Sequence, residues 1–89
     1  PYSLSVAEDC LAVADTANNR VLIYDQLPKA GLGAPAHRVI GQPNFQANGE
    51  NNWKAVTESS LCWPYGLHLH NNILAIADSG NNRVMLWRL

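Results

Sequence analysis

The 89-residue sequence is poor in charge, and its few charges nearly cancel. Only 15% of the residues are Asp, Glu, Lys or Arg, and six basic against seven acidic side chains leave a formal net charge of -1. Nucleic-acid binding needs a cationic surface that neutralises phosphates, and an acidic tail needs an excess of carboxylates. The composition therefore excludes both classes, and we expect no nucleic-acid partner.

Long apolar runs and cysteine pairs are also lacking. No stretch reaches the roughly 20 continuous apolar residues of a membrane helix, so we expect no membrane partner. Cys10 and Cys62 are too few for a disulfide framework, and neither has a neighbour at metal-ligand spacing. We interpret Cys10 as a buried free thiol in an apolar run, with a bond to Cys62 as an unsupported alternative. The apolar share of 47% predicts a folded chain.

What the sequence does contain is an internal repeat. Residues 1–24 align without a gap on residues 64–87, at an offset of 63, and 11 of the 24 pairs are identical. Most of the other pairs keep their character, as Val6 and Leu69 do. Such self-similarity indicates two copies of one structural unit.

Each copy predicts three short antiparallel strands. Runs rich in Val, Leu, Ile and Tyr have strand length and are separated by turn residues. The first two strands of each copy are joined by only two residues, which is the spacing of a tight hairpin. The expected strands are Ser3 to Ala7, Cys10 to Ala14, Arg20 to Asp25, Gly66 to His70, Ile73 to Ala77 and Arg83 to Arg88.

Both faces of the later strands are apolar. Leu11 and Val13 lie on one side of the second strand, and Cys10, Ala12 and Ala14 lie on the other. A sheet that is apolar on both faces must be stacked between neighbouring sheets, and radial stacking of small repeated antiparallel sheets gives a β-propeller. We therefore predict an all-β chain of about two four-stranded propeller blades.

Two motifs carry a family resemblance: Ala-Asp-Thr-Ala-Asn-Asn-Arg-Val over residues 14–21 and Ala-Asp-Ser-Gly-Asn-Asn-Arg-Val over residues 77–84. With the Pro-Tyr-x-Leu that precedes each, they resemble the NHL repeat. The resemblance implies a propeller of four-stranded blades, commonly six, with polar residues that tie the turns and the blade contacts. These architectural residues are Asp15, Asn18, Asn19 and Arg20 in the first copy and Asp78, Asn81, Asn82 and Arg83 in the second.

The offset of 63 residues exceeds the roughly 40 that are typical of a propeller repeat. The surplus contains a Pro- and Gly-rich loop, a candidate fourth strand over His37 to Gly41, and a candidate helical turn over Trp53 to Glu58 capped by Asn52. We expect a first blade over residues 1–42, a connector loop over residues 43–63, and a second blade over residues 64–89 without an outer strand.

The connector contributes the candidate contact residues. Binding sites in propellers usually lie on rim loops, and Phe45, Trp53 and Trp63 are the large aromatic residues of this one. They are candidates for a contact patch for a partner, although packing of the loop on its own blade is the commoner use of such aromatic residues.

His68 and His70 form the one arrangement that suggests a metal. Residues two apart on a strand face the same side with Cα atoms roughly 6.5–7 Å apart, so two imidazoles can share a zinc ion. Some NHL-like propellers are metal-dependent lyases. The first copy has Ser5 and Ala7 at these places, and no third ligand is evident. We therefore predict no metal, no cofactor and no catalytic residue.

These observations predict a non-catalytic binding or scaffolding module, with a metal-dependent lyase or hydrolase that uses His68 and His70 as the alternative. The strand count leaves the second blade with a bare outer edge and leaves two blade faces uncovered. We expect either head-to-tail association, in which three chains give a ring of six blades, or a longer propeller of which this chain is a part. A protein partner fits both, and the sequence assigns no compartment.

Overall fold

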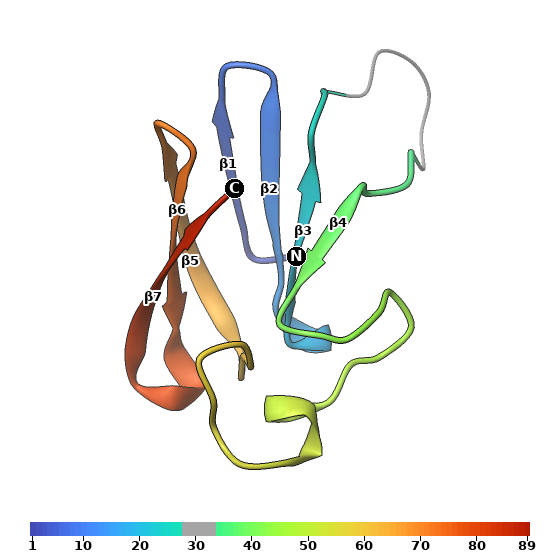
Figure 1. Cartoon of the computed structure of the whole chain (residues 1–89), viewed down its shortest axis with the longest axis vertical. Helices are drawn as coiled ribbons and strands as arrows, with labels where there is room; N and C mark the ends of the chain where they lie inside the picture. Colours follow the sequence, from blue (N-terminus) through green and yellow to red (C-terminus); the bar gives the residue numbers. More distant parts are fainter. Residues whose placement is uncertain (28–33) are drawn as a thin grey trace.

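The computed structural model describes residues 1–27 and 34–89, which form two antiparallel sheets without an α-helix (Figure 1). None of the helical segments in this part of the chain is long or apolar enough to cross a bilayer. The expected four strands followed by three are confirmed. The first sheet has the order β1 (Ser3–Ala7), β2 (Cys10–Asp15), β3 (Arg20–Tyr24), β4 (Arg38–Ile40), and the second has the order β5 (Pro64–His70), β6 (Ile73–Asp78), β7 (Arg83–Arg88).

The hairpin that opens each sheet turns over two residues. Between β5 and β6 these are Asn71 and Asn72, both in the left-handed region with φ of 48° and 62°. Asn tolerates this backbone well, because its short polar side chain can bond locally. The hairpin between β1 and β2 uses Glu8 at φ 56°. Both hairpins lie at one end of the molecule, and the turns after β2 and β6 lie at the other (Figure 1).

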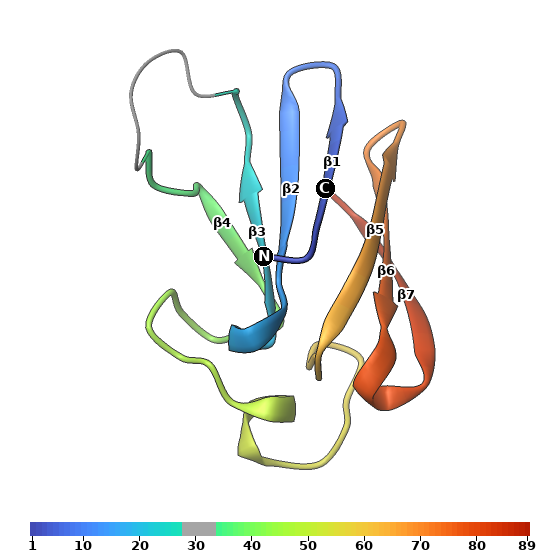
Figure 2. The ribbon, with the colours of Figure 1, turned by 180° about the vertical axis from the view of Figure 1, so that it is seen from behind.

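The two sheets pack face to face through one apolar core. β5 lies closest to β1 and β2, as the view from behind shows (Figure 2). The backbone N–H of Leu69 donates a hydrogen bond to Oγ of Ser5 across this junction (2.9 Å). The completely buried members of the core are Ala12, Val21, Ile23, Leu61, Leu74 and Ile76.

Each sheet also has an outer face that is largely open within the described part of the chain. Leu4 and Val6 on the first sheet are 65% and 56% exposed, and Val84 and Leu86 on the second are 67% and 70% exposed. Because the neighbouring residues of these strands point into the core, each sheet is apolar on both sides.

The connector between β4 and β5 runs past the ends of both sheets (Figure 1, green to yellow). It contains a 3₁₀ turn over Glu50–Trp53, in which Asn51 and Asn52 have φ of 49° and 55°. The expected helical turn over Trp53 to Glu58 is wrong, because left-handed residues do not lead into a right-handed helix. The expected Pro- and Gly-rich loop falls mainly on residues 28–33, outside the described part.

Candidate functional site

The turn between β2 and β3 is closed by the side chain of Asp15. Its Oδ2 accepts hydrogen bonds from Asn18 Nδ2 (3.1 Å) and from Arg20 Nε (2.7 Å), and the second is also an ion pair. Asn19 has a left-handed backbone (φ 54°) that ends the 3₁₀ turn Thr16–Asn18. The spacing of the motif allows this, because Asx side chains bond to groups a few residues away in a tight turn.

The ionisation of Asp15 is fixed by the same contacts. Burial opposes the charged form, but the hydrogen bonds from Asn18 and Arg20 and the charge of Arg20 outweigh it and lower the pKa of the carboxyl below its ordinary 3.8. A general base at neutral pH needs a pKa near 7. The geometry of Asp15 therefore favours a structural role over acid–base catalysis.

The first turn also holds the connector. Arg20 Nη1 donates a hydrogen bond to the carbonyl oxygen of Phe45 (2.5 Å). Asn19 Nδ2 donates to the carbonyl oxygen of Asn48 (3.0 Å), and Asn19 Oδ1 accepts from the backbone N–H of Trp63 (2.8 Å). Asn19 is only 4% exposed, so these partners replace water for a buried amide. Asn19 thus binds two parts of the connector to the first sheet.

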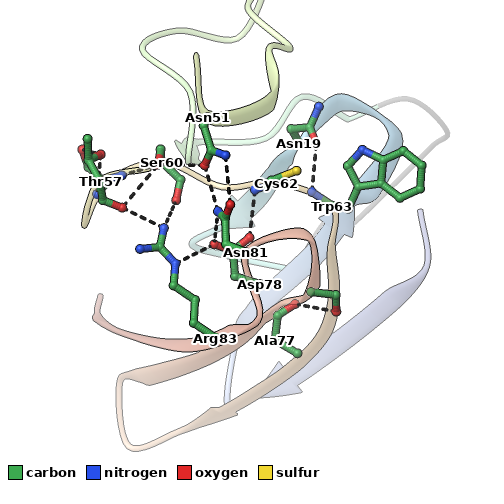
Figure 3. A network of polar contacts seen from close by, with 12 residues as sticks. Asn19, Asn51, Thr57, Ser60, Cys62, Trp63, Ala77, Asp78, Asn81 and Arg83 are labelled. Atoms are coloured by element: carbon green, nitrogen blue, oxygen red, sulfur yellow. Dashed lines mark hydrogen bonds and ion pairs between the residues drawn. The ribbon is translucent and has the colours of Figure 1, made fainter. Parts of the chain in front are cut away.

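Asp78 closes the turn between β6 and β7 from a completely buried position (Figure 3). Its Oδ2 accepts from Asn81 Nδ2 (2.8 Å) and Arg83 Nε (2.9 Å). Its Oδ1 accepts from the backbone N–H of Cys62 (2.8 Å). Three donors, one of them charged, satisfy this buried carboxylate. Asp78 therefore joins the second sheet to the connector while it closes its own turn.

Asn51 and Arg83 extend this network through the connector (Figure 3). The amides of Asn51 and Asn81 pair reciprocally, with Nδ2 to Oδ1 distances of 2.9 and 2.8 Å. Arg83 Nη2 donates to the carbonyl oxygens of Thr57 (2.7 Å) and Ser60 (2.8 Å). The two carbonyl groups lie outside helices and strands, so they need hydrogen-bond donors from side chains or water, and Arg83 provides one. The connector is thereby attached to both sheets.

Asn82 differs from its repeat partner Asn19 in what surrounds it. It has the same left-handed backbone (φ 55°), but its side chain is exposed and bonds to no described residue. The second copy therefore presents the same turn without the connector segment that Asn19 binds in the first.

Two of the three predicted contact aromatics come together. Trp53 and Trp63 line a pocket of about 580 Å³ at the connector end of the molecule. Both have positive φ, at 60° and 53°, which is unusual for a bulky side chain. Phe45 is exposed but lies outside the lining of this pocket.

Sequence reasoning missed Tyr2, Tyr65 and Glu50, which also line the pocket. Tyr2 and Tyr65 are repeat partners, and their rings meet edge to face with centroids 4.5 Å apart. The repeat was the signal that could have found the two tyrosines, because an identical aromatic residue near the start of the first strand of each copy predicts two rings at one end of adjacent sheets. Glu50 offered no such signal, since it belongs to the connector, which occurs once.

His68 and His70 lie on the outer face of β5. Their rings are stacked, with centroids 6.5 Å apart and an interplanar angle of 18°. Among the described residues, no group of three or more His, Cys, Asp or Glu side chains is placed to hold a metal ion. The pair offers two ligands, whereas protein zinc sites use three or four.

Cys10 and Cys62 are free thiols and half-buried. Burial, and to a lesser extent the charge of Asp25, raises the pKa of the Cys10 thiol. Burial, with smaller effects of Glu50 and Asp78, raises the pKa of Cys62. Both are therefore mainly protonated at neutral pH, which is unfavourable for nucleophilic catalysis.

The site thus combines two polar turns at equivalent places of the repeat, a connector bound to both, and an aromatic pocket beside the first turn and the connector. The lowered pKa of Asp15 keeps that carboxyl in its charged form, which favours a structural role for the first turn. A scan against protein-family models and a search of curated proteins each found no match for this chain.

Proposed function

We propose that this chain is a two-blade unit of an NHL-type β-propeller that serves as a non-catalytic binding or scaffolding module and associates with further copies head to tail. The observation that carries the proposal is that the buried face of each sheet has its repeat equivalent on the exposed face of the other sheet. The molecule therefore shows on its outside the same two kinds of face that pack together in its core.

The buried face of the first sheet has an open counterpart one repeat later. Val21 and Ile23 are completely buried in the core that the two sheets form with Leu61 of the connector, whereas their repeat partners Val84 and Leu86 are mostly exposed. The residue types are alike, so the difference lies in what covers them, and no described element covers Val84 and Leu86. A further sheet of the same kind would bury Val84 and Leu86. Burial of each side chain would stabilise the association by about 1.5–3 kcal/mol.

The converse relation holds on the first sheet. Leu69 of the second sheet is 5% exposed in the core, whereas its repeat partner Val6 is open. Leu67 packs against the same core, whereas its partner Leu4 is open. The outer face of the first sheet therefore carries the residue types that cover a neighbour, which supports a heterologous, head-to-tail interface.

The shapes of the open faces agree with this arrangement. Small residues on the second sheet, Gly66, Ala75 and Ala77, border a shallow depression of about 320 Å³ beside Val84. Their repeat partners on the first sheet lie on β1 and β2, the strands against which β5 packs. An approaching β1 from another copy would find the same shape that β5 finds within the chain.

Binding is supported over catalysis by the chemistry of the loops. The pocket lies beside loops that the Asp–Asn–Arg networks hold in place, and rigidly supported loops are where proteins bind partners. The alternative of a metal-dependent lyase or hydrolase depends on His68 and His70 alone. Both histidines lie on the face that the proposed neighbouring copy covers. Stoichiometric zinc in protein purified without a histidine tag would favour the metal-dependent alternative.

The native mass of the chain tests the proposal. At micromolar concentration we expect light scattering to give a multiple of the 9.8 kDa chain mass, with three chains for a ring of six blades. The mass should fall on dilution, because association depends on concentration. A mass of one chain across the micromolar range would contradict the proposed self-association.

A further inference from the structure

The pocket at the connector end has an aromatic wall and one charged side chain. Tyr2, Tyr65, Trp53 and Trp63 supply the rings. Among the described residues that line the pocket, Glu50 alone carries a charged side chain. The faces of aromatic rings are electron-rich, so the wall and the carboxylate both favour a positive ligand.

Two polar side chains of the lining, those of Thr16 and Asn19, are already hydrogen-bonded within the chain. Thr16 Oγ1 donates to the carbonyl oxygen of Pro64 (2.5 Å). The side-chain amide of Asn19 is hydrogen-bonded at both ends, to Asn48 and to Trp63. Thr16 and Asn19 therefore offer little to a sugar or a nucleobase, whereas the ring faces and the exposed Glu50 carboxylate remain open to a ligand.

Glu50 sits beside the rings without a cationic partner in the described chain. Its Oε1 accepts a hydrogen bond from the indole Nε1 of Trp63 (3.1 Å), which holds the carboxylate next to the aromatic wall. The three ion pairs among described residues use Asp15, Asp25 and Asp78 instead. The carboxylate of Glu50 would repel an anionic ligand, so the pocket disfavours phosphates and carboxylates.

Contacts within the chain position the rings of the pocket. A side chain on Gly49 would place its Cβ 2.5 Å from Nε1 of Trp53, so the indole rests directly on this glycine. Tyr2 and Tyr65 hold each other edge to face. Rings that are positioned in this way lose less side-chain entropy when a ligand binds.

We propose that this pocket binds an alkylated ammonium group. Methyl groups on nitrogen spread the positive charge over an apolar surface that matches ring faces, while Glu50 supplies the counter-charge. Free choline-type molecules and methylated lysine side chains share this chemistry. The inference is independent of the proposed assembly, because the native mass does not depend on the ligand.

Choline and its uncharged isostere dimethylbutanol provide the direct test. We expect choline to quench or shift tryptophan fluorescence saturably, and to bind at least about tenfold more tightly than the isostere. Glu50→Gln should weaken choline binding by about tenfold and leave the isostere unchanged, and Trp53→Leu should weaken both. Phe45→Leu is the matched control, since this exposed ring lies outside the pocket.

Two further arms separate the sources of the group. A short peptide with trimethyl-lysine that competes with choline and binds more tightly assigns the site to modified protein, and tighter binding of choline assigns it to small molecules. Equal affinity for choline and the isostere, absence of saturable binding, or an unchanged affinity in Glu50→Gln protein with a native circular dichroism spectrum would overturn the proposal.

Discussion

Asp15 and Asp78 occupy the same place in the repeat but different environments. The side chain of Asp15 is 16% exposed, whereas that of Asp78 is completely buried and also accepts the backbone N–H of Cys62. The connector makes the difference, because it covers the second turn on a side that is open in the first. A single motif therefore provides a partly buried ion pair in one copy and a completely buried carboxylate with three donors in the other.

Acid should weaken the fold through Asp15. Its folded-state pKa lies below the ordinary 3.8, so the native carboxyl releases its proton more readily than the unfolded one. The stabilisation that ionised Asp15 contributes is complete at a pH above the ordinary pKa of 3.8. It is lost as the pH falls from there through the lower folded-state pKa. Asp15→Asn should reduce the free energy of unfolding at neutral pH by about 1–3 kcal/mol and reduce the additional loss in acid. Urea denaturation from neutral pH to pH 2 measures both.

Asp25→Asn is the matched control for this prediction. Asp25 also pairs with an arginine, Arg38, but both side chains are more than 40% exposed. Exposed pairs contribute about 0–1 kcal/mol, so this variant should stay close to the parent protein. A loss as large as that of Asp15→Asn would show that burial does not set the contribution of the pair.

Sequence could indicate the local contacts of these residues but not their distant ones. Asp15, Asn18 and Arg20 lie within six positions, and a tight turn leaves them few other partners. The bonds of Arg83 to Thr57 and Ser60 join positions more than 20 residues apart and end on backbone carbonyls. Every residue has such a carbonyl, so no side-chain pattern could reveal which ones are used.

At the level of elements, the first turn has Ala17 where the second has Gly80, and the connector explains this difference. Cys62 of the connector packs directly on Gly80. A Cβ at position 80 would lie only 2.5 Å from the carbonyl oxygen of Cys62. The same carbonyl accepts the backbone N–H of Gly80 (2.8 Å). Ala17 stands at the repeat-equivalent position and is exposed, so a methyl group is accommodated there.

Gly80→Ala should therefore destabilise the second turn. The close carbonyl belongs to backbone, which moves only with the connector, so overpacking should lower the free energy of unfolding by about 1–3 kcal/mol. Ala17→Gly, the reciprocal change in the first copy, should cost at most about 1 kcal/mol through backbone entropy. Denaturation of both variants at one fixed chain concentration compares them, and equal losses would contradict the role assigned to Cys62.

Strands were predictable and the connector was not, for a physical reason. The strands are runs of β-branched and aromatic residues bounded by turn signals, and each occurs twice. The connector has no apolar period, and its turn depends on the left-handed residues Asn51 and Asn52, of which Asn51 is held by hydrogen bonds to Asn81 and Leu61. Those partners come from tertiary structure, which a local pattern does not contain.

At the scale of the whole molecule, the repeat predicted two equivalent sheets, and the structure adds which face of each is covered. One covered and one open face on each sheet mean that the chain alone leaves apolar surface in water. Two kinds of association could remove it. Either the two open faces pair with each other head to tail, or each open face pairs with itself in a second copy.

Single charges on the open faces distinguish these alternatives. Val84→Asp disables the outer face of the second sheet, and Val6→Asp disables that of the first, because burying an unpaired carboxylate costs several kcal/mol. Head-to-tail pairing predicts that each variant alone has the mass of one chain. It also predicts that their mixture forms a dimer of one copy of each, through the two faces that remain intact.

Pairing of like faces predicts the opposite pattern, since each variant alone would still dimerise through its intact face. Val56→Asp is the matched control, because Val56 is 52% exposed on the connector rather than on either sheet, and this variant should keep the parent mass. Light scattering of the three variants and of the mixture reads out all outcomes. Because Val6 and Val84 are already exposed, neither charge should disturb the fold of the single chain, so an unchanged circular dichroism spectrum ties any loss of mass to the interface.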